Sequence, residues 1–167
     1  MHDRATDLGP MISVAARDRV LTELGRAVAA GARIVTGGTV PDGLGAGAWI
    51  TPTIVADAAP ESAIVQDESF GPVAVIQVAD DLDHAIALAN GVRQGLVLAA
   101  CTDDPTARAT IADRAEAGMV QLGAGPLPVH PDAPFGGWKA SGIGPPEHGE
   151  WDVSYFARTQ AVYGDLG

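Results

Sequence analysis

The sequence predicts an α/β fold, a partial doubly wound parallel sheet with a protruding C-terminal β-strand. From Pro72 onward, apolar segments of strand length alternate with segments of helical periodicity, in the order strand, helix, strand, helix, strand. Those strands are almost continuously apolar, which is typical of parallel strands that are buried on both faces and joined by right-handed crossovers. The third observation is a β-prone run, residues 154–163, near the end of the chain.

The elements before Pro72 follow a less regular pattern. Ser13 has the side chain of a helix N-cap, and apolar residues recur at helical spacing after it until Gly31 supplies a stop signal. The short apolar run 33–36 is a strand candidate. Residues 49–55 are also β-prone, but Pro52 lacks a backbone N–H, so we expect an edge strand or a strand with a break there.

The second half of the chain carries clear start and stop signals. Asp104 followed by Pro105 is a helix start, and Gly118 is a stop. Residues 123–144 show no periodicity, and a loop of that length is usually functional or packed against something else. The expected elements are a strand at 73–78, a helix at 81–90, a strand at 95–101, a helix from 104 to 118 and a strand at 119–122.

Composition narrows the function classes. A chain of 167 residues is one domain by length, and 47% hydrophobic content with 21 Gly and 12 Pro is typical of a soluble, loop-rich globular protein. A formal charge of −11 disfavours nucleic acid as a partner, because phosphate backbones are bound by Lys and Arg. There is no apolar run of membrane-spanning length and no signal-peptide region at the start. A single cysteine cannot form an internal disulfide, so we expect a cytoplasmic location.

The stretch 66–73 is the first candidate site. It holds an acidic pair, an aromatic ring and a Gly71-Pro72 step that leads into an apolar strand. Gly tolerates backbone angles that other residues avoid and Pro fixes its own, so the step predicts a sharp change of direction. Glu68 and Phe70 are then expected at the mouth of the strand. Without further support, such a stretch is as often a structural loop as a site.

Support comes from a family resemblance. The run 67–73 (Asp-Glu-Ser-Phe-Gly-Pro-Val) is similar to the glutamate and Phe-Gly-Pro signature of the NAD(P)-dependent aldehyde dehydrogenase superfamily. Four further stretches agree with that family in the same order, namely 8–13, 52–54, 89–90 with 95–96, and 134–142. The resemblance corresponds to the C-terminal third of a family member. It implies that residues 1–153 are the end of the catalytic domain and that residues 154–167 are an oligomerisation strand and tail.

The resemblance also implies site residues. In the family, the glutamate that matches Glu68 hydrogen-bonds the nicotinamide-ribose hydroxyls, and the ring that matches Phe70 packs beside the nicotinamide. An ionised carboxylate only accepts hydrogen bonds, which suits two hydroxyl donors. The ring that matches Phe135 lines the aldehyde pocket. The alternatives are a solvated acidic loop for Glu68 and an ordinary core phenylalanine at 135.

Other residues with reactive side chains have structural interpretations. Lys139, the sole lysine, is expected to be a solvated or salt-bridged cation. Cys101 is expected to be a buried structural thiol in a strand, because no His or Lys lies near it in sequence to lower its pKa. Gly123 departs from the family, which often has asparagine there. No metal is expected, because the histidines lack metal-ligand spacing; they are His2, His84, His130 and His148.

The resemblance leaves several functions open. The family oxidises aldehydes to carboxylic acids with NAD or NADP, but its nucleophile, general base and cofactor-binding turns match positions before residue 1. We therefore name no catalytic residue and interpret the chain as a truncated or split member, without activity and without bound cofactor when alone. One alternative is a non-catalytic assembly module that pairs with itself or with a full-length aldehyde dehydrogenase through residues 154–163. Another is a small-molecule binding domain that uses Glu68 and Phe70.

Overall fold

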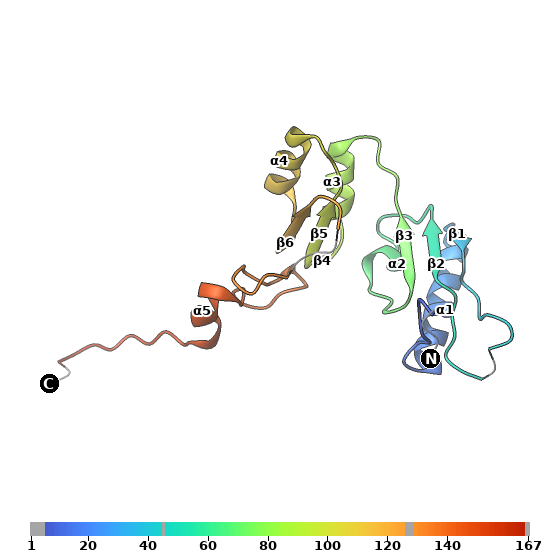
Figure 1. Cartoon of the computed structure of the whole chain (residues 1–167), viewed down its shortest axis with the longest axis horizontal. Helices are drawn as coiled ribbons and strands as arrows, with labels where there is room; N and C mark the ends of the chain where they lie inside the picture. Colours follow the sequence, from blue (N-terminus) through green and yellow to red (C-terminus); the bar gives the residue numbers. More distant parts are fainter. Residues whose placement is uncertain (1–5, 45, 126–128, 166–167) are drawn as a thin grey trace. The chain divides into compact units, whose positions relative to one another are not determined.

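The computed structural model describes residues 6–44, 46–125 and 129–165 and divides into two compact units, Met1–Leu88 and Ala89–Gly167 (Figure 1). Each unit is described by itself. Unit 1 contains α1 (Val14–Ala29), β1 (Arg33–Thr36), β2 (Thr53–Ala56), α2 (Ala63–Gln66) and β3 (Val73–Ile76). Helix α3 (Leu82–Asn90) spans the boundary. Unit 2 contains β4 (Gln94–Gly95), β5 (Val97–Ala100), α4 (Pro105–Arg114), β6 (Met119–Leu122), β7 (Trp138–Lys139), a 3₁₀ turn η1 (Gly149–Trp151) and α5 (Asp152–Phe156).

Helix α1 forms where the sequence predicts it. The hydroxyl of Ser13 accepts a hydrogen bond from the Ala16 N–H (3.1 Å), which satisfies a donor at the start of the helix. Past the end of the helix, Gly31 adopts a φ of 103°. The buried face of α1 carries Val20 and Leu24, which pack with Val55 of β2 in the core of unit 1. Periodic apolar residues thus place this helix against the sheet.

The sheet of unit 1 has the order β1-β2-β3. Strand β2 pairs antiparallel with β1 and parallel with β3, so it is the central strand rather than the expected edge strand. The edge-strand alternative was wrong because Pro52 lies just before the strand and removes no donor from its ladder. The other alternative, a break at Pro52, agrees with a strand that begins only at Thr53. The first strand residue, Thr53, donates its N–H to the Pro72 carbonyl (2.8 Å).

Unit 2 is built around a parallel pair, β5 and β6, connected through α4. Helix α4 begins after Asp104, whose carboxylate accepts from the Thr106 N–H (2.8 Å). The predicted strand 95–101 is divided, because β4 pairs antiparallel with β7 while β5 pairs with β6. The parallel α/β character is confirmed. The three strands predicted after Pro72 do not form one sheet, however, because β3 pairs with β2 whereas β5 pairs with β6.

The C-terminal run 154–163 does not form the predicted strand. Residues 152–156 are the helix α5, and residues 157–163 are exposed without regular secondary structure. A strand needs a partner for its N–H and C=O groups, and no described segment pairs with this run. Its β-prone residues therefore stay unpaired. The proposed boundary between residues 153 and 154 lies inside α5 and stays a prediction.

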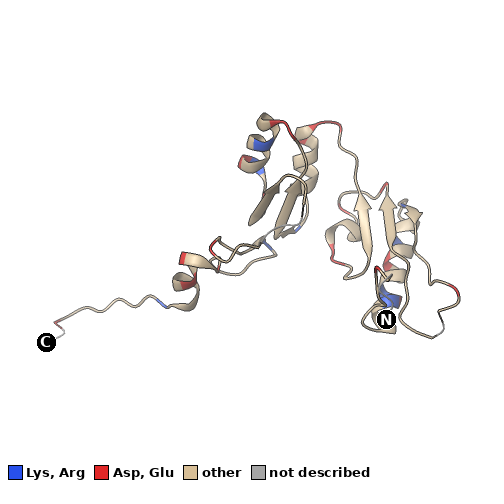
Figure 2. Ribbon diagram, in the orientation of Figure 1, with Lys and Arg blue, Asp and Glu red and all other residues tan. Residues whose placement is uncertain are grey.

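Charged residues lie on both units. Figure 2 shows basic positions on α1 and α4 and acidic positions scattered over the two units. Within the described residues, no helix has the length and apolar character that a membrane crossing requires.

Candidate functional site

The Phe-Gly-Pro turn of unit 1 is anchored on the core. It leads into β3, as the sequence predicts, and it follows the short helix α2, which was not predicted from the sequence. A Cβ at Gly71 would lie 2.8 Å from Cγ2 of Val20, so the turn backbone rests directly on α1. Pro72 accepts a hydrogen bond from the first residue of β2, Thr53. The turn is therefore held against both the helix and the sheet.

The two predicted cofactor residues lie at the surface of this turn. Phe70 is 76% exposed and has a φ of 49°, a left-handed conformation that is unusual for a bulky side chain. Glu68 is also exposed, and the neighbouring carbonyl of Ser69 accepts a hydrogen bond from Arg19 Nη2 (3.4 Å). An accessible carboxylate beside an accessible ring fits contact with the ribose and nicotinamide of a dinucleotide. Their role in binding stays a prediction.

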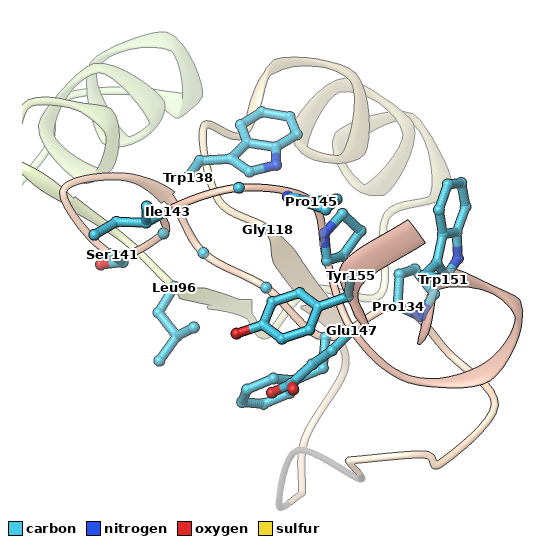
Figure 3. Close-up of a pocket in the computed structure, with 16 residues that line it drawn as sticks. Leu96, Gly118, Pro134, Trp138, Ser141, Ile143, Pro145, Glu147, Trp151 and Tyr155 are labelled. Atoms are coloured by element: carbon cyan, nitrogen blue, oxygen red, sulfur yellow. The ribbon is translucent and has the colours of Figure 1, made fainter. Parts of the chain in front are cut away.

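A pocket of about 480 Å³ in unit 2 contains the third predicted residue, Phe135 (Figure 3). Its wall presents both apolar and polar surface, with Leu96 and Ile143 on one side in this view and Trp151 on the other, and with the carboxylate of Glu147. The pocket lies wholly within unit 2, so Phe135 is described apart from Glu68 and Phe70. Phe135 is half-buried in this wall, and its role in binding an aldehyde stays a prediction.

The backbone and ring of Phe135 are both fixed. Its N–H donates to the Glu147 carbonyl (2.8 Å), and its own carbonyl accepts from the Glu147 N–H (2.9 Å). The ring faces His148, with centroids 5.3 Å apart and planes tilted by 31°. The next residue, Gly136, crosses Gly118 so closely that a Cβ at 118 would overlap the Gly136 carbonyl. Residues 135–136 of the long aperiodic segment are therefore held in a defined wall by contacts on both sides.

Sequence reasoning missed the part of the wall that comes from the C-terminus. Trp151 and Tyr155 line the pocket from η1 and α5. Their spacing of four residues is the spacing that places two side chains on one face of a helix, and this signal was available in the sequence. It was overlooked because residues 154–163 were interpreted as a strand.

Cys101 is exposed, so the expectation of a buried thiol was wrong. It lies one residue beyond β5, where the strand has ended, and its Sγ contacts the Gly123 carbonyl at 3.8 Å. Lys139 is salt-bridged, as expected, with Nζ 2.8 Å from Glu116 Oε2. The described residues contain no cluster of three or more His, Cys, Asp or Glu side chains that could hold a metal ion.

Comparison with protein families shows which family contains this turn and this pocket segment. The model of the aldehyde dehydrogenase family matches residues 1–162 of this chain. The chain belongs to the aldehyde dehydrogenase family. Its aldehyde dehydrogenase relatives include betaine aldehyde dehydrogenase 1 of Rhizobium meliloti, 40% identical over 99% of this chain, and aldehyde dehydrogenase LUC3 of a Fusarium species, 37% identical over 95%.

Solved aldehyde dehydrogenases have the same fold. An aldehyde dehydrogenase of Mycobacterium tuberculosis complexed with NAD+ superposes with a TM-score of 0.86 over 99% of this chain, at 36% identity. A betaine aldehyde dehydrogenase of Staphylococcus aureus in complex with NAD+ gives a TM-score of 0.83 over 92%, at 32% identity. The chain spans about a third of the length of these relatives, 34% of the Rhizobium and Mycobacterium proteins and 31% of the Staphylococcus protein.

Proposed function

We propose that this chain supplies the C-terminal part of an NAD(P)-dependent enzyme that oxidises aldehydes to carboxylic acids. The observation that carries this proposal is the family match over residues 1–162, together with the placement of Phe135 in the wall of a pocket that offers apolar side chains. The overall reaction would convert an aldehyde, water and NAD(P)+ to a carboxylic acid, NAD(P)H and a proton. A cytoplasmic location is part of the proposal, because the single cysteine needs no oxidising compartment.

Each predicted residue has a defined task in this proposal. Phe135 packs against the apolar part of the aldehyde and excludes water from it. Glu68 accepts hydrogen bonds from ribose hydroxyls, and the exposed ring of Phe70 packs beside the nicotinamide. When bound, NAD(P)+ supplies the acceptor for the hydride. The strained backbone of Phe70 is consistent with a functional constraint, since such conformations gather at ligand sites.

The chemical step would require polypeptide beyond these 167 residues. Covalent aldehyde oxidation needs an activated nucleophile with a base in reach. Within the described residues, the hydrogen bond of the Cys101 thiol goes to a backbone carbonyl, that of Gly123, which activates no thiol. We therefore propose that neither turnover nor firm cofactor binding belongs to the isolated chain.

A complementation assay tests this proposal. The purified chain is incubated with NAD+ and a panel of aldehydes, alone and with the separately produced upstream two-thirds of the Mycobacterium relative. We expect NADH formation only in the mixture, lowered by Phe135→Ala and unchanged by Cys101→Ala. Sustained NADH formation by the chain alone, whether or not it survives Cys101→Ala, would overturn the proposal.

A second candidate function is a non-catalytic assembly module. It is favoured by the exposed, unpaired run after α5, in which Val162 is 61% and Tyr163 is 93% exposed. Such a run could add as a strand to a second copy or to a full-length aldehyde dehydrogenase. Size-exclusion chromatography of the chain, alone and with a full-length relative, tests it. Association that disappears when residues 157–167 are deleted would support this candidate, and association that survives the deletion would exclude this run as its cause.

A further inference from the structure

The ammonium group of Lys139 is held at the end of a helix. Its Nζ donates to the backbone carbonyl of Asn90 (2.6 Å), the last residue of α3, and to that of Val92 (3.3 Å). It also pairs with Glu116 Oε2 (2.8 Å), just beyond α4. A cation is favourable at a helix C-terminus, where carbonyl groups lack partners within the helix. The side chain is only 24% exposed, so this lysine is not a freely solvated charge.

The residue that accepts from Lys139, Asn90, is itself held in place because it takes part in three hydrogen bonds. Besides accepting from Lys139 through its backbone carbonyl, Asn90 donates from Nδ2 to the Arg114 carbonyl (2.8 Å). Its Oδ1 accepts from the Glu116 N–H (2.9 Å). The ends of α3 and α4 are thereby joined, and the lysine bonds to both. This explains why a lone Asn and a lone Lys, far apart in sequence, belong to one structural cluster.

Lys139 also belongs to the strand that carries the pocket wall. In β7 it lies opposite Gln94, and Trp138 lies opposite Gly95. Its φ of 52° is a strained, left-handed conformation that persists only when the surroundings impose it. Lys139 is the first corner residue of a tight turn that the Ser141 N–H closes on the Trp138 carbonyl (3.0 Å), a position at which some turn types require a positive φ.

The wall continues from β7 in both directions. After it, Ala140 donates to the Arg93 carbonyl (3.1 Å), and Ser141 Oγ accepts from the Gly95 N–H (3.0 Å). Before it, two glycines lead back to Phe135. A displacement of β7 would therefore be transmitted over three residues to the Phe135 ring.

We propose that Lys139 is a positioning residue for Phe135. Its ammonium group bonds to Asn90 and Glu116 and thereby holds β7 in its pairing with β4. This pairing determines the position of the Phe135 ring in the pocket and relative to His148. The importance of this placement for aldehyde binding rests on the proposed function. The placement itself is a property of the chain and is measurable without turnover.

The test compares variants of the 167-residue chain by NMR and amide hydrogen exchange. Lys139→Met keeps the aliphatic stem and removes the charge, Lys139→Arg restores a cation, and Glu116→Gln removes the ion pair but leaves both carbonyl bonds. Arg33→Met is the matched control, because it removes a cation from an exposed ion pair with Asp57 in unit 1. The readouts are the exchange rates of amides in the wall (Phe135, Ala140 and Glu147), those in the β5–β6 ladder, and the ring-proton shifts of His148.

We expect Lys139→Met to raise exchange in the wall by at least about tenfold, since bonds to a charged donor are lost, while the β5–β6 ladder stays within about threefold of wild type. The His148 shifts should move as Phe135 leaves its place, Lys139→Arg should restore both readouts, and Arg33→Met should change neither. Glu116→Gln should raise exchange in the wall by a smaller factor. If Lys139→Met does not fold, this variant tests the proposal in its place.

Three outcomes would overturn the proposal. They are unchanged exchange in the wall, equal acceleration in the wall and the ladder, and a failure of arginine to restore the His148 shifts. None of these outcomes bears on the complementation assay, so the positioning role and the proposed function can fail separately.

Discussion

Four non-glycine residues of the described chain have positive φ, and three of them lie at the candidate sites. Phe70 is in the Phe-Gly-Pro turn, Lys139 is in β7 and His148 stacks on Phe135; only Asp57 lies elsewhere. Such conformations cost about 1–3 kcal/mol each and persist where the surroundings over-determine them. Asp and His are several-fold enriched at positive φ, whereas for a bulky side chain such as Phe70 this conformation is unusual. At Lys139 the conformation belongs to a tight turn, which the Ser141 N–H closes on the Trp138 carbonyl (3.0 Å).

A pair of glycine substitutions tests how the Phe-Gly-Pro turn is anchored. We expect Gly71→Ala to destabilise the chain by about 1–3 kcal/mol, because the new methyl group would press on the buried, β-branched Val20. Gly25→Ala, inside α1 and with nothing within 4 Å of its Cβ position, should instead stabilise by about 0.5–1 kcal/mol. Urea unfolding followed by circular dichroism measures both. Equal effects of the two substitutions would show that the turn does not rest on α1.

Helix α4 shows how far local signals determine an element. Its N-cap, Asp104, and its first residue, Pro105, stand where the sequence predicts them, and β6 forms over the predicted residues 119–122. These are short-range signals, since an N-cap bond reaches only two residues along the chain. The pairing of strands, in contrast, depends on residues that are distant in sequence. The pattern of β-prone residues identified β2 but could not place it in the centre of its sheet.

Substitutions of two neighbouring aspartates test whether the N-cap stabilises α4. Asp104→Ala should lower stability by about 1 kcal/mol, because the Thr106 N–H loses its acceptor. Asp103→Ala removes the same charge from a fully exposed side chain 3.7 Å from Arg108, and we expect no measurable change in the unfolding midpoint. Thermal unfolding of both variants provides the comparison. A larger loss for Asp103→Ala would mean that charge, not capping, stabilises the start of the helix.

The whole molecule combines a strong negative charge with exposed apolar side chains. Ile12, Phe70, Phe156 and Tyr163 are each at least 75% exposed, while the formal charge is −11. Like charge keeps such surfaces apart at neutral pH.

We therefore expect self-association to grow as the pH falls towards about 4.5, where protonation of carboxylates brings the net charge to zero. Added salt at neutral pH should act in the same direction, because it screens the repulsion. Light scattering across the pH range measures this. Scattering that stays flat down to the isoelectric point would contradict the role of charge, and deletion of residues 157–167 shows how much of the effect the tail contributes.

The sequence by itself determined the family, the α/β class, the starts of α1 and α4 and the turn that carries Glu68 and Phe70, because these depend on residue order and on contacts within a few residues. Only the tertiary structure decided that β2 is central, that Cys101 is exposed and that Tyr155 joins Phe135 in one pocket wall. These features depend on which distant segments meet. The hydrogen-bonding capacity of a strand or a lysine does not specify its partner until the chain has folded.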